Sequence, residues 1–304
     1  MNHSGGGPQA TRPARVVSVG RNSVWIAFEG SDELHHASLP KRLERLSLVP
    51  GDLVHAAVLD AERVIVERRE PRSFALERTS AGGRVKTMAA NIDGIAIVSA
   101  VSQPPFHQTM VDELLAFAAI YQITARLLLT KLDLATPEAA GAIVHLYHSL
   151  GYIVFTAHPK AGVGVDAIEA ALRGHRTLLI GQSGVGKSSL FRALGGPATV
   201  GEVSAIGRGR QTTTTGRLHH FDDGFLIDSP GVSEFELDGM TTADIANGFV
   251  EFVPLIGSCK FTDCSHRTEP ACAIRAAVDA GRIARSRYDS YLAIVSRSSV
   301  QTTY

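Results

Sequence analysis

Short apolar runs separated by turn residues dominate the N-terminal part of the chain. Apolar and polar side chains alternate at residues 16–19, 24–28, 53–58 and 63–66, and Gly, Asn, Asp and Pro residues interrupt these runs. A period of two is typical of strands that bury one face. Several such strands in about 60 residues predict a small barrel of the SH3-like or OB-like kind over residues 12–70.

Further along the chain, the pattern changes to apolar strands that alternate with helical segments. Strand-like runs occur at 95–98, 125–129 and 152–155, and segments with helical spacing lie between them. One helix is expected to start at Thr136 and Pro137, because an N-cap residue is followed there by a proline at the first helical position. Strands that alternate with helices predict a parallel sheet with covering helices.

A glycine-rich loop follows the next predicted strand and precedes a helix. It runs from Gly181 to Ser188 and matches the pattern G-x-x-x-x-G-K-[ST] of a phosphate-binding P-loop. The backbone N–H groups of such a loop bind phosphate oxygens. Lys187 is expected to reach the β- and γ-phosphates, and the Ser188 hydroxyl to ligate Mg²⁺. The other loop residues expected at the nucleotide are Gln182, Ser183, Gly184, Val185, Gly186 and Ser189.

A second motif precedes the P-loop and predicts recognition of a base. Residues Thr130 to Asp133 have the form [NT]-K-x-D at the end of a predicted strand. The Asp133 carboxylate could accept both N1–H and N2–H of guanine, a donor pair that adenine lacks, and the Lys131 stem could lie along the base. Thr156 and Ala157 predict a second turn beside the base, with the Ala157 N–H directed toward guanine O6. Without a P-loop beside it, the tetrapeptide would more often be a turn at the start of a helix.

Two stretches after the P-loop resemble GTPase switches. A threonine run begins about 25 residues after Lys187, where a switch loop supplies a ligand to Mg²⁺ and the γ-phosphate, and Thr213 is predicted for this role. An apolar strand then ends in D-x-x-G. Asp228 is expected to hold the Mg²⁺ shell through water, and the Gly231 N–H to contact the γ-phosphate.

The residue that orients the attacking water is less evident from the sequence. Val232 stands where many small GTPases place a glutamine, so intrinsic hydrolysis is expected to be slow unless another group acts. Gln211, just before the threonine run, is the nearest candidate, and a partner could also supply the group. The residues predicted to take part in catalysis are Lys187, Gln211, Thr213 and Gly231.

All three cysteines of the chain lie in one C-terminal stretch. Cys259, Cys264, His266 and Cys272 form a Cys₃His set, which is typical of closed, structural zinc sites. The alternative is three buried free cysteines. Because four protein ligands leave no position for water, a bound zinc would be structural rather than catalytic.

The composition narrows the possible functions of the chain but does not identify one. The chain has 304 residues, 44% hydrophobic content and a formal net charge of zero, so nucleic-acid binding would need local basic patches. No apolar run is long enough for a transmembrane helix, and residues 1–11 are expected to be a flexible tail. The few clustered cysteines fit a reducing cytosol. We therefore expect a cytoplasmic monomer without membrane contact.

The order of the motifs along the chain is similar to that of a known family. The base-reading motif precedes the phosphate motifs, whereas it comes last in ordinary GTPases, so the chain looks like a circularly permuted GTPase. With the barrel before and the Cys/His cluster after, it resembles the ribosome small subunit-dependent GTPase A (RsgA) family. The matching stretches are 90–93, 130–133, 181–189, 212–214, 228–231 and the Cys/His cluster. That family commonly has His where this chain has Gln211, and Gln can orient water but cannot act as a near-neutral acid or base.

The resemblance implies an α/β P-loop GTPase core, circularly permuted, between an OB-like β-barrel and a mainly helical zinc-binding domain. It implies a GTP hydrolase that uses Mg²⁺ and one structural Zn²⁺ held by the matching Cys₃His ligands. It further implies a late assembly factor that binds rRNA of the small ribosomal subunit, is stimulated by that subunit and is released after hydrolysis. An RNA-binding nucleotide switch with little turnover and a P-loop ATPase are the alternatives. The expected domains are a tail (1–11), barrel (12–70), connector (71–90), GTPase domain (91–237) and zinc-binding domain (238–304).

Overall fold

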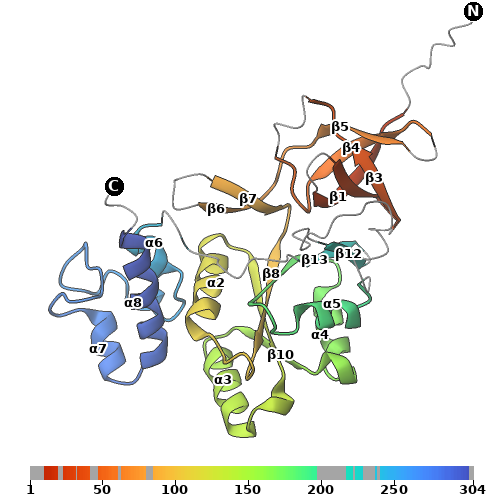
Figure 1. Cartoon of the computed structure of the whole chain (residues 1–304). Coiled ribbons are helices and arrows are strands. Elements are labelled where there is room, and N and C mark those ends of the chain that lie inside the picture. The colour runs from red at the N-terminus through yellow and green to blue at the C-terminus, as the bar shows by residue number, and fades with distance from the viewer. Residues whose placement is uncertain are drawn as a thin grey trace, which may run out of the picture.

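The structure is a computed structural model, and it describes most of the chain (Figure 1). The described residues are 10–19, 23–31, 33–41, 47–60, 63–79, 85–196, 217–221, 223–228, 237 and 240–300. They form a barrel, a central sheet with helices on both faces, and a helical C-terminal region. Within these ranges, no helix combines the length and the apolar character needed to cross a bilayer.

The N-terminal barrel is closed and has the strand order β1-β2-β3-β5-β4. Its strands are β1 (Arg12–Val19), β2 (Ser23–Phe28), β3 (Leu34–Ser38), β4 (Leu53–Val58) and β5 (Val64–Arg69). All neighbouring pairs are antiparallel except β3 with β5. Alternate apolar residues fill the interior, as the period of two requires: Val16, Ile26, Val54 and Val66 have no exposed surface. The predicted barrel is confirmed.

The stretch 71–90, expected to be a connector, contains an antiparallel hairpin. Its strands are β6 (Ala75–Thr79) and β7 (Val85–Ala90). Leu76 and Ala89 face each other in the register and are fully buried, and Ala90 is buried as well, while mostly polar residues separate them from the hairpin's turn. So few buried apolar positions are too weak a pattern to predict two strands, which is why the sequence analysis missed them.

The central sheet has six strands in the order β10-β9-β8-β11-β13-β12. In chain order they are β8 (Gly94–Ala100), β9 (Thr124–Thr130), β10 (Ile153–Ala157), β11 (Arg176–Ile180), β12 (Arg217–Phe221) and β13 (Gly224–Asp228). All neighbours are parallel except β12, which pairs antiparallel with β13 at the edge. The parallel sheet expected from alternating strands and helices is therefore present.

Helices cover both faces of this sheet because alternate strand residues point to opposite sides. Ile95 and Ile97 belong to the core under α2 (Gln108–Ile120) and α3 (Pro137–Ser149). Ala96 and Val98 belong to the core under α4 (Val165–Leu172) and α5 (Lys187–Ala193). Short 3₁₀ turns follow β9 (η1, Leu132–Leu134) and β10 (η2, Pro159–Ala161) at the carboxyl ends of these strands.

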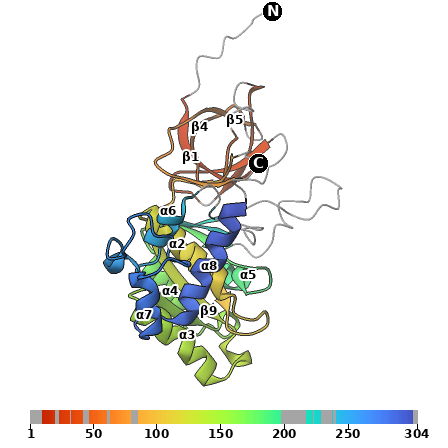
Figure 2. The same cartoon turned by 90° about the vertical axis from the view of Figure 1, so that its left-hand side faces the viewer.

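The C-terminal region packs against α2 rather than forming a core of its own among the described residues. It contains α6 (Thr242–Asn247), η3 (Val253–Leu255), α7 (Ala273–Asp279) and α8 (Arg285–Val300). Phe249, Tyr291 and Ile294 share one apolar cluster with Leu114 and Phe117 of α2. Figure 2 shows α8 beside α2 below the barrel. The mainly helical character predicted for this region is confirmed.

Candidate functional site

The P-loop lies between β11 and α5, as predicted. Gly181 leaves the strand with a φ of +154°, and a Cβ built there would lie 2.1 Å from the Val98 carbonyl oxygen. Only glycine fits this close approach between the loop and β8. Gly186 has a φ of +100° and caps α5, where the left-handed backbone turns the chain into the helix. The loop therefore has the backbone shape that binding of phosphate oxygens requires.

Lys187 reaches back across the loop. Its Nζ donates to the carbonyl oxygens of Gly181 and Gln182, each at 2.6 Å. Burial lowers the pKa of Lys187, and the nearby Asp228 carboxylate opposes this shift. Asp228 ends β13 in register with Leu179 of β11 and is buried. The sheet register therefore brings the two predicted phosphate-side residues together. Ser188, predicted as a Mg²⁺ ligand, is exposed at the start of α5.

The predicted guanine motif lies directly against the P-loop. The Thr130 hydroxyl is buried and donates to the Val185 carbonyl oxygen at 2.5 Å, with the Ser99 carbonyl at 3.4 Å. The structure thus joins two motifs that are 55 residues apart in the chain. Lys131 adopts a left-handed backbone with a φ of 56°, and its Nζ donates to the Gln103 carbonyl. No sequence motif indicates this contact with the loop after β8.

Asp133 and the second predicted base-side turn are also neighbours. Ala157 pairs in register with Thr130, so β10 ends beside the guanine motif. Thr156 is exposed there and Ala157 is buried. The Asp133 carboxylate lies 3.5 Å from Nε2 of His158, and Nδ1 of that ring accepts a hydrogen bond from the Ala161 N–H at 3.1 Å. His158 was missed by the sequence analysis, although its place directly after Ala157 could have drawn attention to it.

Three predicted residues lie outside the part of the chain that the structure describes. These are Gln211, Thr213 and Gly231. Their assigned roles, contact with Mg²⁺, the γ-phosphate and the attacking water, stay predictions. Asp228 is the last described residue before the D-x-x-G stretch continues.

The four predicted metal ligands converge. The ligand atoms of Cys259, Cys264, His266 and Cys272 all lie within 4.8 Å of one another. Sγ of Cys259 and of Cys272 each lie 3.5 Å from Nδ1 of His266, and the two sulfurs are 3.9 Å apart. Zn–S bonds of about 2.3 Å and Zn–N bonds of about 2.0 Å in a tetrahedron give edges of about 3.5–3.8 Å. The residues therefore fit a tetrahedral metal ion, and a single ion would satisfy all four.

A network of hydrogen bonds supports the ligand loop. Glu269 accepts from the Ser265 N–H and hydroxyl and from the N–H groups of Arg267 and Thr268. The hydrogen bond from the Ser265 hydroxyl is the main cause that lowers the pKa of Glu269 to about 2, and the backbone N–H groups add to it. From α8, the Tyr288 hydroxyl donates to the carbonyl of His266 at 2.7 Å. The loop is thus also held in place by side chains other than the four predicted metal ligands.

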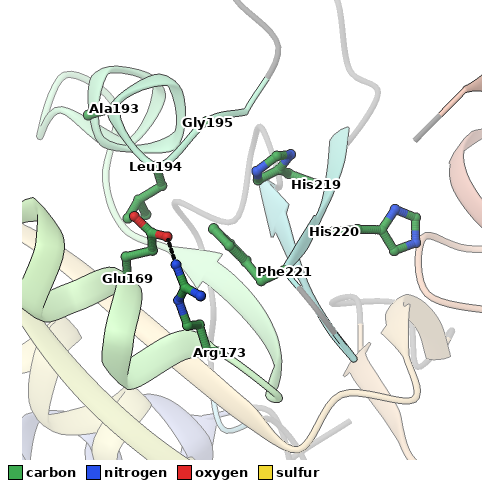
Figure 3. A pocket seen from close by; sticks show the side chains of 8 residues that line it. All are labelled: Glu169, Arg173, Ala193, Leu194, Gly195, His219, His220 and Phe221. Atoms are coloured by element: carbon green, nitrogen blue, oxygen red, sulfur yellow. Dashed lines mark hydrogen bonds and ion pairs between the residues drawn. The ribbon is translucent and has the colours of Figure 1, made fainter. Parts of the chain in front are cut away.

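A cavity of about 400 Å³ lies at the far end of α5 from the P-loop (Figure 3). Its described lining comes from α4, from the end of α5 and from β12. Figure 3 shows the ion pair between Glu169 and Arg173, whose atoms are 2.6 Å apart, facing His219 and Phe221 of the edge strand. No motif in the sequence pointed to this cavity.

The parallel sheet, the P-loop and the preceding guanine motif define the class of protein: a P-loop GTPase whose elements are circularly permuted. The family model described as RsgA GTPase matches residues 69–238. The chain is 43% identical to the small ribosomal subunit biogenesis GTPase RsgA of Chromohalobacter salexigens, over 88% of this chain and 79% of that protein. It is 38% identical to the protein of the same name from Dickeya dadantii, over 97% of this chain and 88% of that one. The chain therefore belongs to the RsgA GTPase family.

Solved structures agree with this assignment. YjeQ from Thermotoga maritima matches with a TM-score of 0.72 and 28% identity, covering 95% of this chain and 99% of that one. YloQ, a circularly permuted GTPase, matches with a TM-score of 0.71 over 99% and 98% of the two chains. At 21% identity, the second likeness supports the fold alone. The predictions of the family, the permuted fold and a GTPase are confirmed.

Proposed function

We propose that this GTPase acts in the maturation of the small ribosomal subunit, binds rRNA there, and is stimulated by the subunit to hydrolyse GTP, after which it is released. The names of its relatives support this role, since they are small ribosomal subunit biogenesis GTPases. The observation that supports the GTPase part is the hydrogen bond from Thr130 to Val185, which joins the T-K-x-D stretch to the P-loop.

Each residue at the nucleotide has an assigned task. The P-loop N–H groups and Lys187 would neutralise charge on the phosphates, which is the main contribution of a protein to phosphoryl transfer. Ser188, Thr213 and Asp228 would hold Mg²⁺, and Gly231 would contact the γ-phosphate. Asp133 would select guanine, with Lys131 along the base and Ala157 toward O6. Gln211 would position the attacking water without taking its proton.

The Cys₃His set would hold one structural Zn²⁺. Its donor set fits zinc better than Mg²⁺ or Ca²⁺, because thiolates are soft ligands whereas those two ions prefer oxygen. No ligand position is left for water or substrate, so the ion would order the loop and leave the reaction to the nucleotide site. We further propose that the protein works as a cytoplasmic monomer, in keeping with a ribosomal partner.

The test is GTP turnover by the purified protein, alone and with isolated small or large ribosomal subunits, with ATP as the control nucleotide. Stimulation by the small subunit only, and for GTP only, is the expected result. Slow turnover that neither subunit changes would contradict the proposal and favour an RNA-binding nucleotide switch. Zinc content, measured by atomic emission on the same sample, is expected at one ion per chain.

A further inference from the structure

His158 stands directly after the second predicted base-side turn and faces the predicted guanine motif. Its Nε2 lies 3.5 Å from Oδ1 of Asp133, within ion-pair distance. The two residues come from different turns: Asp133 lies in η1 after β9, and His158 caps η2 after β10. The pairing of β9 with β10, in which Ala157 is opposite Thr130, brings these turns to the same edge of the sheet. The contact is therefore set by the sheet and not by sequence neighbours.

The turn that carries His158 is closed by its own hydrogen bonds. The His158 N–H donates to the Val163 carbonyl at 2.9 Å, and the Ala161 N–H donates to the His158 carbonyl at 2.9 Å. The same Ala161 N–H also donates to Nδ1 of the ring, at 3.1 Å. The turn η2 lies beside α5, the helix that follows the P-loop. Both the backbone and the ring of His158 are thus held in place next to the predicted nucleotide site.

The hydrogen bond at Nδ1 determines where the ring carries its proton. A neutral imidazole has one N–H donor and one acceptor nitrogen. Because Nδ1 accepts from Ala161, we assign the proton of the neutral ring to Nε2, the nitrogen that faces Asp133. His158 thus presents a donor to a carboxylate oxygen. A shift of about 0.6–0.8 Å would bring the pair to the distance of a charge-assisted hydrogen bond, about 2.7–2.9 Å.

The contact with His158 leaves Asp133 able to bind a base. The Asp133 side chain is 49% exposed, so the ring does not enclose the carboxylate. The two oxygens of a carboxylate offer about four acceptor sites, and guanine N1–H and N2–H would use two of them. An ion pair this exposed adds little to stability. Its consequence is therefore orientation, because a donor at one oxygen restricts the rotation of the carboxylate.

We propose that His158 is a positioning residue for guanine selection: its Nε2–H holds the Asp133 carboxylate in the orientation that accepts N1–H and N2–H of the base. The proposal rests on the role of Asp133 in the proposed function. A carboxylate that rotates freely loses this freedom when the base binds, which weakens binding, whereas one already held by a neighbour does not. Guanine offers both donors, hypoxanthine only N1–H, and adenine neither. Loss of the Nε2 donor should therefore weaken the binding of GDP most, that of inosine diphosphate (IDP) less, and that of ADP not at all.

The experiment separates the two ring nitrogens by substitution in the full chain. His158→Asn keeps an acceptor near the position of Nδ1 but has no donor at Nε2, whereas His158→Gln keeps a donor near Nε2. The Kd values of GDP, IDP and ADP and the thermal midpoint are measured for each variant and for wild type. H158N is expected to weaken GDP binding about tenfold and IDP binding about threefold, without changing the Kd of ADP. H158Q is expected to bind GDP within about threefold of wild type.

His148→Asn is the matched control. It makes the same chemical change at an exposed position in the last turn of α3, at the end of that helix far from Asp133. All three Kd values are expected to stay within about twofold of wild type. Wild-type affinity for GDP in H158N, a loss in H158Q as large as that in H158N, or an equal loss for GDP and ADP would each overturn the proposal.

A further variant keeps the test decisive if H158N does not fold. His158 is the N-cap of η2, and Ser is a favoured N-cap residue whose hydroxyl can accept the Ala161 N–H. Serine is too short to reach Asp133, so His158→Ser should keep the turn and lose the Nε2 donor. The same preferential loss of GDP affinity is expected, and wild-type affinity in H158S would overturn the proposal.

A double variant tests whether His158 acts through Asp133. In the background of Asp133→Ala, H158N is expected to change the Kd of GDP by less than about twofold, because no carboxylate is left to position. A further tenfold loss in the double variant would overturn the proposal, since His158 would then contact the base itself. Failure of the proposed function would look different: D133A alone would keep the preference of wild type for GDP over ADP, or wild type would show no such preference, and either result would remove the basis of the proposal.

Discussion

The proposed metal site and the proposed nucleotide site of this protein are built in opposite ways. The four predicted metal ligands lie within one loop, between Cys259 and Cys272, and their ligand atoms are all within 4.8 Å of one another. The nucleotide site takes its residues from the ends of separate strands. Thr130 meets Val185 across 55 residues of sequence, and Asp228 reaches the P-loop through the register of β13 with β11.

This difference determines what each site depends on. With a bound ion, as proposed, the loop would depend on that ion and on local hydrogen bonds such as those to Glu269, so a defect there is expected to stay local. The nucleotide site depends on the sheet, so a shift of one strand moves several of its residues together. The effect of a mutation can therefore be assigned to the Cys₃His loop or to the nucleotide site by how far it spreads along the chain.

Removal of the metal is expected to have the largest effect. A structural zinc ion contributes on the order of 10 kcal/mol to local folding. In Cys259→Ser, or after chelation, residues 258–272 should lose amide protection in hydrogen exchange, while α8 keeps it because Arg287 still binds Asp112. The adjacent exposed Ser258→Ala is the control. Loss of protection throughout α8 would show that the loop and the helix fold as one unit.

Gly181→Ala is expected to have the next largest effect. The added Cβ would lie 2.1 Å from the Val98 carbonyl oxygen, so the P-loop must move away from β8. Strain of about 3 kcal/mol corresponds to a loss of GDP affinity on the order of 100-fold, measured with a fluorescent analogue. Metal content should not change, because the defect lies in the sheet.

Gly184→Ala is the matched control for this change. Gly184 also has a positive φ, of +79°, but nothing lies within 4 Å of a Cβ built there. Only the backbone penalty of about 1 kcal/mol remains, so the loss of affinity should be about fivefold. Equal losses in the two variants would mean that backbone conformation, and not the contact with Val98, explains the result.

The same contrast explains which parts of the fold and of the candidate sites could be predicted from the sequence. The P-loop, the T-K-x-D stretch and the Cys₃His set are short patterns, and each is visible in the sequence because its chemistry fixes residue types at short spacing. The roles of the last two, at guanine and at a metal ion, stay predictions. The barrel and the parallel sheet followed from the period of apolar residues. The order of motifs identified the permuted core, since order along the chain is visible without a structure.

Contacts between distant residues could not be predicted. Glu113 of α2 accepts hydrogen bonds from the Leu237 N–H and from the Arg297 guanidinium, and nothing near it in the sequence indicates these contacts. The β6–β7 hairpin was missed because few of its described residues, Leu76, Ala89 and Ala90, are buried. His158 was missed because its place beside Asp133 depends on the turn after β10. Such pairs are fixed by tertiary packing rather than by local propensity.

Asp133→Asn tests the nucleotide site at its base end, far from the phosphates. Asparagine presents an NH₂ group toward the guanine N2–H, so guanine loses an acceptor and xanthine, with an oxygen at that position, gains a donor. GDP affinity is expected to fall on the order of 100-fold, with xanthosine diphosphate now preferred. Competition binding measures both, and the exposed Asp166→Asn on α4 is the control. Unchanged preference for GDP would contradict the role of Asp133.

Glu269→Gln is expected to have the smallest effect, and it tests how far the metal loop depends on its own hydrogen bonds. The pKa of Glu269 is lowered from 4.5 to about 2 by the Ser265 hydroxyl and the loop N–H groups. A lowered pKa in the folded state means that the charged carboxylate stabilises the fold above pH 4.5, and that this stabilisation is lost as the pH falls toward 2. The variant should therefore be less stable than wild type by about 1 kcal/mol at pH 7, and the difference should shrink below pH 4.5. Because a bound metal ion would be released from both proteins in acid, the difference between their unfolding curves isolates Glu269. A difference that stays constant down to pH 2 would mean that the size of the side chain, and not its charge, holds the loop.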